Sequence, residues 1–426
     1  MKRWIWIPIV IILAGIAVTW RAFSMNVPHH PDVKATAAMV QRGAYLVRAA
    51  DCVSCHTVPG HAPFSGGREF DLGSMGTLYS PNITPDKATG IGTWSDDDFR
   101  RAMQLGVGKG GVHLYPAFPY ASFTHLTDAD VLAIKAYLFS LTPVHYIPPA
   151  DAMRFPYDMR FLMAYWSWLF DSNHRFAPDP GQSAQWNQGK YLVVALGHCG
   201  ECHTSRNLLQ AVDHSKAYAG ALTQSWKAYD ITPDKQTGIG SWSDADLVSY
   251  LSTGFAKDHG PASGPMAEAV SNSLRYLPKS DIEAIVTYLR SLKPLPSAVT
   301  VADAASAPEA SGAAGASPAS EDTNIDYGHQ VFVRECANCH RTDGTGTQSE
   351  YESLAGSASL TDPQAVNLTQ AVLFGSTLDT ADGHFFMPRF GKGLKNVDLA
   401  AVIDYVSLKL GGHSANLTPK DVAARR

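Results

Sequence analysis

The arrangement of six cysteines constrains this chain more than any other feature of its sequence. They form three C-x-x-C pairs, and a histidine follows each pair directly. Such a pair also occurs in zinc clips, redox dithiols and disulfides, but a zinc clip needs a second pair close in sequence, and none is present. Three C-x-x-C-H motifs that use every cysteine predict covalent attachment of three haem c groups. The motif residues are Cys52, Cys55 and His56; Cys199, Cys202 and His203; and Cys336, Cys339 and His340.

The spacing within each motif suits this chemistry. Two cysteines three positions apart lie on one helical turn and can form thioethers to one porphyrin. The next histidine can then bind the iron as its proximal ligand. Covalent haem attachment takes place on the oxidising side of a membrane, so we expect the chain to be exported.

The N-terminus predicts how export occurs. Lys2 and Arg3 precede an apolar run of 17 residues, from Trp4 to Trp20, and Arg21 follows it. This length is at the short end for a membrane span. A cleaved signal peptide is the alternative, but residues 19–24 are bulky and charged and offer no small-x-small cleavage site. We therefore expect a single-pass helix in the bacterial inner (cytoplasmic) membrane, with the haem domains on its periplasmic side.

An internal repeat predicts the architecture. The string from Asn82 to Asp96 recurs from Asp230 to Asp244, a constant 148 residues later, and in each copy a Ser-x-x-Asp pattern predicts a helix start. A glycine-containing helix precedes each motif, and a related helix with a tyrosine seven residues after its leading aspartate closes each repeat. This pattern predicts a mainly α fold of three tandem class I cytochrome c domains behind an N-terminal transmembrane helix. The glycines are Gly43, Gly189 and Gly328; the tyrosines are Tyr137, Tyr288 and Tyr405.

The predicted boundaries follow from these repeats and from composition. The segment between the first two domains is dense in Met and aromatic residues and is either a packed connector or a docking surface. A stretch rich in Ala, Ser, Pro and Gly reads as a flexible linker. The expected parts are an anchor (1–24), domain one (30–145), an aromatic connector (146–180), domain two (181–295), a linker (296–323) and domain three (324–415).

Electron-transfer haems are usually six-coordinate, with a methionine sulfur opposite the histidine. Met266 and Met387 precede the closing helices of domains two and three, where a loop can cover the second haem face. At the offset of 148, Met266 corresponds to Phe118, which cannot bind iron. We expect His113 to be the distal ligand of haem one, because it lies on the loop that would cross the haem. Other residues remain open for this role: His125, Met103 and Met75.

The chain resembles the three-haem cytochrome c subunits of bacterial membrane-bound periplasmic dehydrogenases that oxidise alcohols, gluconate, other sugar acids or aldehydes. The strings that carry the resemblance are 82–86, 114–117, 153–156, 197–204 and 335–344. The resemblance implies a subunit without substrate chemistry of its own. It would take electrons from one or more catalytic dehydrogenase subunits and pass them to ubiquinone, an oxidase or another respiratory acceptor.

This sequence departs from the alcohol dehydrogenase members at two points. They usually have methionine in place of Phe118, and they usually carry a cleaved signal peptide. The chain is more similar to cytochromes that partner molybdopterin-dependent aldehyde dehydrogenases. A PQQ alcohol dehydrogenase and an FAD gluconate or sugar dehydrogenase are the alternative partners.

Rival functions have weaker support. An open iron site on haem one, beside Phe118, is compatible with a multi-haem peroxidase, and a terminal oxidase component ranks behind it. The chain has no Rossmann fingerprint, phosphate loop or nucleophile constellation. Its formal net charge of −5 argues against nucleic acid as a partner.

Overall fold

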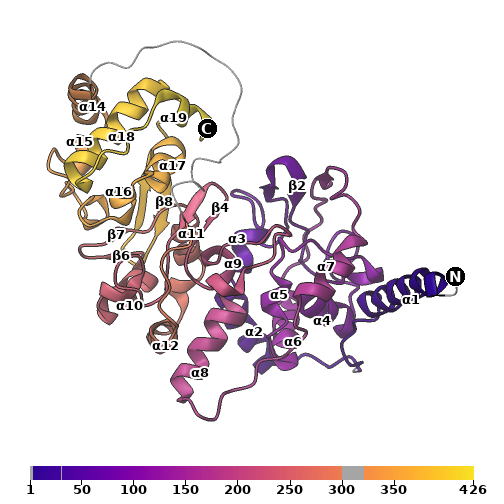
Figure 1. Ribbon diagram of the computed structural model, residues 1–426. Coiled ribbons are helices and arrows are strands. Elements are labelled where there is room, and N and C mark those ends of the chain that lie inside the picture. The colour runs from indigo at the N-terminus through magenta and orange to yellow at the C-terminus, as the bar shows by residue number, and fades with distance from the viewer. Residues whose placement is uncertain (1–2, 30, 300–320) are drawn as a thin grey trace. The chain divides into compact units, whose positions relative to one another are not determined.

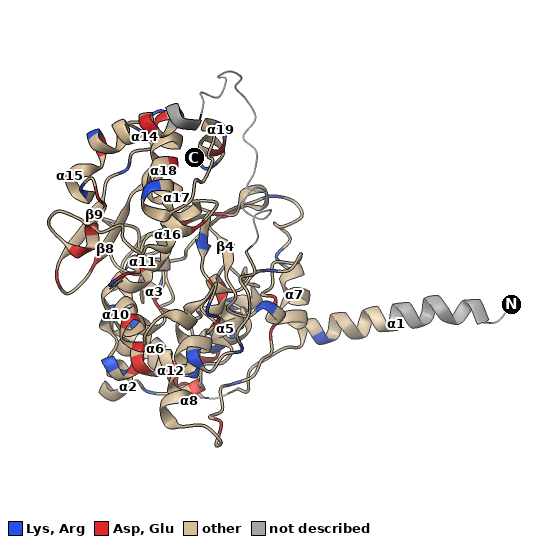
Figure 2. Ribbon diagram, turned by 60° about the vertical axis from the view of Figure 1, so that its left-hand side comes forward, with Lys and Arg blue, Asp and Glu red and all other residues tan. Residues whose placement is uncertain are grey.

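The structure is a computed structural model that describes residues 3–29, 31–299 and 321–426. It is mainly helical, as predicted (Figure 1). It divides into two compact units, Met1–Glu201 and Cys202–Arg426, so the boundary falls inside the second C-x-x-C-H motif. Most of the predicted linker, 296–323, lies outside the described residues. Acidic and basic residues are interspersed along the ribbon (Figure 2).

The first unit combines helices with one small antiparallel sheet. The sheet has the strand order β1-β2-β3, and β3 comes from the predicted connector. The strands are β1 (Glu69–Asp71), β2 (Gly76–Tyr79) and β3 (Ala152–Met153). The helices are α1 (Arg3–Phe23), α2 (Ala37–Ala49), α3 (Cys52–His56), α4 (Asp96–Leu105), α5 (Tyr120–Phe123), α6 (Asp128–Ser140), α7 (Leu162–Phe170) and α8 (Ala184–Tyr191), with 3-10 turns η1 (Gly73–Met75) and η2 (Lys109–Gly111) and a π-helical turn η3 (Leu192–Leu196).

The second unit contains the remaining helices and three two-stranded hairpins, while α9 (Gly200–His203) runs across the boundary. Its helices are α10 (Asp244–Thr253), α11 (Gly264–Asn272), α12 (Lys279–Arg290), α14 (Glu321–Glu335), α15 (Ala337–His340), α16 (Ala358–Thr361), α17 (Val366–Phe374), α18 (Asn396–Gly411) and α19 (Pro419–Ala424). Its strands are β4 (Ala221–Thr223), β5 (Trp226–Ala228), β6 (Phe255–Ala256), β7 (Gly260–Pro261), β8 (Ser376–Asp379) and β9 (His384–Met387). Its 3-10 turns are η4 (His214–Lys216), η5 (Ile239–Ser241), η6 (Leu274–Tyr276) and η7 (Glu350–Glu352).

The predicted single-pass membrane anchor is wrong. Among the residues that the structure describes, no helix has the length and apolar character needed to cross a membrane. A span needs about 20 consecutive, predominantly apolar residues. The run that suggested the anchor has only 17, and the helix that contains it begins with Arg3 and includes Arg21 near its end.

Glycine allows the opening and closing helices to cross at close range. α2 packs against α6, and α14 packs against α18 (Figure 1). A Cβ atom on Gly43 would lie 1.9 Å from the carbonyl oxygen of Ala133, and one on Gly328 would lie 2.1 Å from that of Ala401. Any larger residue would therefore force the helices apart. The predicted helix pair thus exists around the first motif and around the third.

The sequence repeat is also a structural repeat. In the first copy the N–H of Leu114 donates to the carbonyl of Gly106, and in the second Ala262 donates to Gly254, both at 2.7 Å. The helix starts match as well. Ser95 and Asp98 form a reciprocal capping box at the start of α4. At the start of α10, Ser243 accepts the N–H of Asp246 in the same way.

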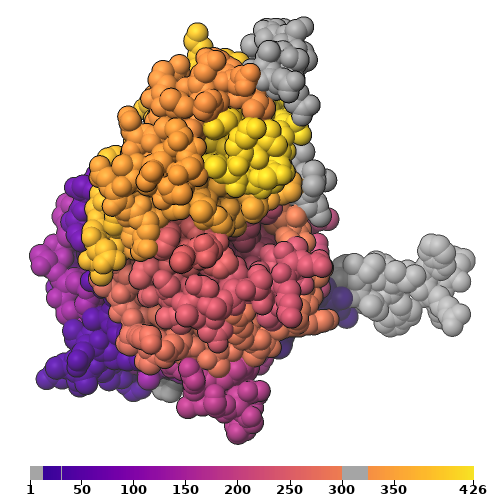
Figure 3. Space-filling model, turned by 90° about the vertical axis from the view of Figure 1, so that its left-hand side faces the viewer, coloured from indigo at the N-terminus to yellow at the C-terminus, as the bar shows by residue number. Residues whose placement is uncertain are grey.

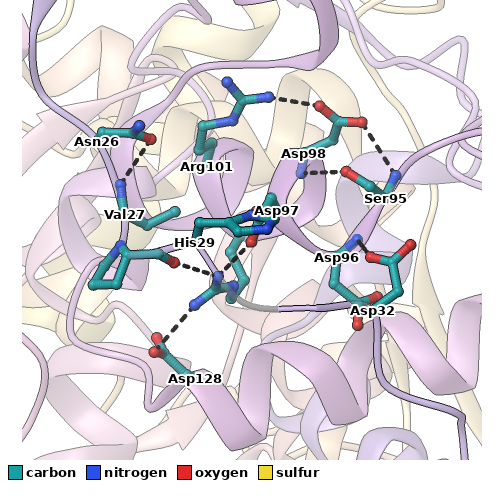
Figure 4. Close-up of polar contacts among 12 residues, drawn as sticks. Asn26, Val27, His29, Asp32, Ser95, Asp96, Asp97, Asp98, Arg101 and Asp128 are labelled. Atoms are coloured by element: carbon teal, nitrogen blue, oxygen red, sulfur yellow. Dashed lines mark hydrogen bonds and ion pairs between the residues drawn. The ribbon is translucent and has the colours of Figure 1, made fainter.

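The segment before α2 is held against the first turn of α4 by polar contacts (Figure 4). The Asp96 side chain accepts the N–H of Val33 at 2.7 Å, while its own N–H donates to Asp32 at 2.8 Å. Lys135 of α6 forms an ion pair with the same buried carboxylate. These contacts join the segment before α2 to α4 and α6.

The predicted connector packs on the first unit. Trp166 of α7 meets Tyr120 edge-on with ring centroids 5.9 Å apart, and Ser167 lies 3.1 Å from the Tyr120 hydroxyl. The hydroxyl of Tyr115 donates to the carbonyl of Tyr157 at 2.8 Å. Several aromatic side chains of this segment nevertheless remain exposed, with Phe155 at 79%.

Candidate haem-binding site

The three motif histidines share one kind of hydrogen bond. Nδ1 of His56 lies 2.8 Å from the carbonyl oxygen of Pro81, and Nδ1 of His203 lies 2.7 Å from that of Tyr229. Nδ1 of His340 lies 2.6 Å from the carbonyl of Glu352. A carbonyl can only accept, so Nδ1 carries the proton in all three rings. This contact fixes the ring and leaves Nε2 as the nitrogen that can bind a metal.

Burial keeps the imidazoles suited to metal binding. Desolvation lowers the pKa of His56 and of His203, although the carbonyl contact of each partly opposes the shift. A lowered pKa favours the neutral ring, which is the form that ligates iron.

The cysteines are unlike activated thiols. All six are free of disulfides. Burial raises the pKa of the Cys52 thiol to about 12 and that of Cys336 to about 11. Reactive dithiols show the opposite shift, since they need the thiolate at neutral pH. The pairs that contain Cys52 and Cys336 therefore lack the lowered thiol pKa of a redox dithiol.

Comparison with known proteins agrees with this geometry. The cytochrome c family model matches residues 40–142 and 325–408. The chain is 37% identical to the fructose dehydrogenase cytochrome subunit of Gluconobacter japonicus, over 89% of this chain and 81% of that protein. It is also 37% identical to the gluconate 2-dehydrogenase cytochrome c subunit of Pantoea cypripedii, over 93% and 91%.

The chain belongs to the family of cytochrome c subunits of dehydrogenase complexes. A further relative is a subunit of the nicotinate dehydrogenase of Pseudomonas putida, which is 41% identical over 92% of this chain. The cytochrome spans only 32% of the length of that relative. The family implies haem c. The motif residues fit it, because paired thiols stand one turn from a histidine whose free nitrogen is Nε2.

The structure brings Met387 and the third motif together. Met387, at the end of β9, packs against the buried core between α14, α17 and α18, and Cys336 and Ala337 pack against the same core. Met387 and Cys336 thus border one apolar core.

Met266 lies in a second, smaller core, where β8 packs against α11. The second unit contains two described segments, residues 202–299 and 321–426. Figure 3 shows the face on which they lie side by side, the first in pink to orange and the second in orange to yellow. Ala262, Ala267, Val270 and Leu378 form this core, and Tyr351 packs against it. Leu378 and Tyr351 come from the C-terminal part of the chain. Met266, which lies in helix α11 and not in a loop, therefore packs against the same core as the β8–β9 hairpin that ends at Met387. His203 is not a member of this core.

His113 lies beside the end of α1. Its ring meets Phe23 edge-on with centroids 5.6 Å apart, and it lines a pocket of about 360 Å³ with residues 22–26 and Arg101. Burial lowers its pKa, and Nδ1 is buried without a hydrogen-bond partner among the described residues. His113 therefore lacks the carbonyl contact that the three motif histidines share.

Phe118 packs against Phe123, which in turn packs against His198. The Phe118 centroid lies 5.5 Å from that of Phe123, and Phe123 lies 5.6 Å from His198, the residue before the second motif. The other histidine and methionines considered for haem one are placed differently. His125 lies with Nδ1 at 2.9 Å from the carbonyl of His174, Met103 is buried in α4, and Met75 ends η1.

Sequence reasoning missed the carbonyls that orient the histidines. Two of them, Pro81 and Tyr229, immediately precede the repeated string at 82–96 and 230–244. The repeat was visible, but a backbone carbonyl leaves no mark on residue identity. The ring contact between His198 and Phe123 was missed for a different reason, since the two residues lie 75 positions apart in sequence.

Proposed function

We propose that this cytochrome binds three haem c groups in three tandem domains and carries electrons from a catalytic dehydrogenase subunit to ubiquinone or another respiratory acceptor. The observation that supports it most is the repeated histidine geometry, with Nδ1 on a backbone carbonyl in all three motifs. Bound haem c supplies a one-electron iron couple. The cysteines of each motif hold the porphyrin, and His56, His203 and His340 provide the proximal nitrogens.

The distal side differs between the three sites in this proposal. Met266 and Met387 supply sulfur to haems two and three, which raises their potentials. His113 is the proposed ligand of haem one, where Phe118 replaces methionine. Haem one should therefore have a potential unlike those of the other two.

The ligand set is tested with volume-conserving substitutions. Met266→Leu and Met387→Leu each remove one sulfur with little change in packing. Each should lower the potential of a single haem in a spectroscopic redox titration of the full chain. Met163→Leu, in α7 outside the proposed sites, is the control and should change no potential. Unchanged potentials in both test variants would reject the methionine assignment.

Haem number is tested directly. The pyridine haemochrome assay on the purified chain, together with its intact mass, should give three covalent haems. His203→Ala should remove or destabilise one haem, while His214→Ala, on an exposed turn, should retain all three. Two haems in the unaltered chain would contradict the proposed architecture.

For the partner, we propose a molybdopterin-dependent aldehyde dehydrogenase, because Phe118 departs from the pattern of the alcohol dehydrogenase cytochromes. The relatives are subunits of nicotinate, fructose and gluconate dehydrogenases, so similar cytochromes serve several different dehydrogenases. Co-purification of the catalytic subunit, followed by identification of its cofactor, tests the choice. Recovery of PQQ or flavin in place of molybdopterin would overturn it.

A further inference from the structure

His198 connects the attachment points of the first and second haems. It directly precedes Cys199, and its ring is hydrogen-bonded to the backbone of Ala50, two residues before Cys52. The same ring lies edge-on to Phe123 of α5, at 5.6 Å between centroids. The two motifs are 147 positions apart in sequence, yet one side chain bridges the residues beside them.

The backbone at His198 is held in an uncommon conformation. Its φ of +37° lies in the left-handed region, which a residue other than glycine seldom adopts. Such conformations persist where the surrounding structure over-determines them, and they cluster at functional sites. Asp51, the residue before the first motif, has a φ of +50° and occupies the equivalent position.

Neighbouring contacts hold the bridge in place. The Ser122 hydroxyl donates to Glu201, inside the second motif, at 2.9 Å. The Tyr191 hydroxyl donates to Asp130 of α6 at 2.7 Å, and η3 packs against α5 and α2. The chain is thus fixed to the first unit on both sides of His198, so the ring keeps one position.

We propose that His198 couples electron transfer between haem one and haem two, which rests on the proposed function. Electron tunnelling is faster along bonds and hydrogen bonds than across gaps. From Cys52 the path follows the backbone to Ala50, crosses one hydrogen bond to His198 and reaches Cys199 through the next peptide. One electron leaves one haem iron and reaches the other, with no bond made or broken. His198 acts as a positioning residue and does not bind iron.

The test compares three variants of the full haem-loaded chain. His198→Leu removes the hydrogen bond, His198→Gln keeps an amide that can donate to Ala50, and His214→Gln alters an exposed histidine on η4 as the control. After flash photoreduction, relaxation between haems one and two is followed at the haem α-bands. The rate should fall several-fold in His198→Leu and recover in His198→Gln, because only the second variant keeps a side chain that can donate a hydrogen bond to the Ala50 backbone.

Two further readouts separate this inference from the proposed function. Haem count and the three potentials should be the same in every variant. An unchanged relaxation rate in His198→Leu, with all haems present, would overturn the role of His198 alone. Fewer than three haems in the unaltered chain would instead overturn the proposed function. If His198→Leu does not fold, His198→Ala removes the same hydrogen bond without adding bulk, and the same two rate outcomes apply.

Discussion

Replacing Gly328 by alanine should disrupt the helix crossing that closes the third motif region. The new Cβ would lie 2.1 Å from the carbonyl oxygen of Ala401 and 2.8 Å from the Cβ of Tyr405. Real Cβ contacts hardly ever fall below 3.0 Å, so α14 and α18 must separate by 3.0 − 2.1 = 0.9 Å at this point. The backbone atom on α18 cannot rotate away, and the helices have to move.

The expected loss follows from the core that the two helices share. Six side chains of this core are fully or nearly buried between the two helices. If burial of each contributes about 2 kcal/mol to stability, together they contribute roughly 12 kcal/mol. A gap of this size forfeits at least about a quarter of the contact energy, or roughly 3 kcal/mol. Alanine has a better helix propensity than glycine, which stabilises the fold by about 1 kcal/mol. The net loss is about 2 kcal/mol. The six side chains are Val331, Phe332, Leu399, Val402, Ile403 and Val406.

Thermal unfolding of the haem-loaded chain measures this loss. For a unit of this size, a loss of about 2 kcal/mol lowers Tm by roughly 4–8 °C. Circular dichroism and Soret absorbance should report the same shift. Gly393→Ala is the matched control, since its new Cβ would find its nearest neighbour at 3.9 Å, and it should stay within about 0.5 kcal/mol of the unaltered chain. A Gly328→Ala variant as stable as that control would refute the close-packed crossing.

Three other substitutions have defined outcomes. Phe118→Met should supply a sulfur to haem one and raise its potential in a redox titration; an unchanged potential would place the loop away from the iron. Burial raises the pKa of Asp171 to about 6, above its value in the unfolded chain. Ionisation of this carboxyl therefore lowers the stability of the fold by roughly 2–3 kcal/mol as pH rises from about 4 to above 6. Asp171→Asn should therefore gain Tm over the unaltered chain at pH 7.5 but not at pH 4, and an equal gain at both would contradict this cause. Lys227→Met should lower the free energy of unfolding by about 3–5 kcal/mol, because it leaves the fully buried Asp362 carboxylate without the ammonium group that Lys227 places 2.7 Å away. Lys279→Met, which removes an exposed pair, should change it by less than about 1 kcal/mol.

The local chemistry of the motifs could be predicted from the sequence because it depends on neighbours in the chain. Two thiols and an imidazole within five residues lie on one helical turn wherever that turn is placed. The helix starts at Ser95 and Ser243 are local in the same sense, because each serine side chain accepts the N–H of a residue three positions later. These features do not depend on long-range contacts, so residue identity and spacing were enough.

The tertiary structure decided what depends on distant partners. The carbonyls of Pro81, Tyr229 and Glu352 orient the histidines from 25, 26 and 12 residues away, and a carbonyl has no sequence signature. The N-terminal run was misread because its 17 residues lie at the threshold for a span, where composition alone does not decide. The spacing of the cysteines and histidines thus predicted haem c from the sequence, and the match to the cytochrome c family agrees with it. Only the fold determined how each ring is held, because a hydrogen bond joins atoms that folding brings together.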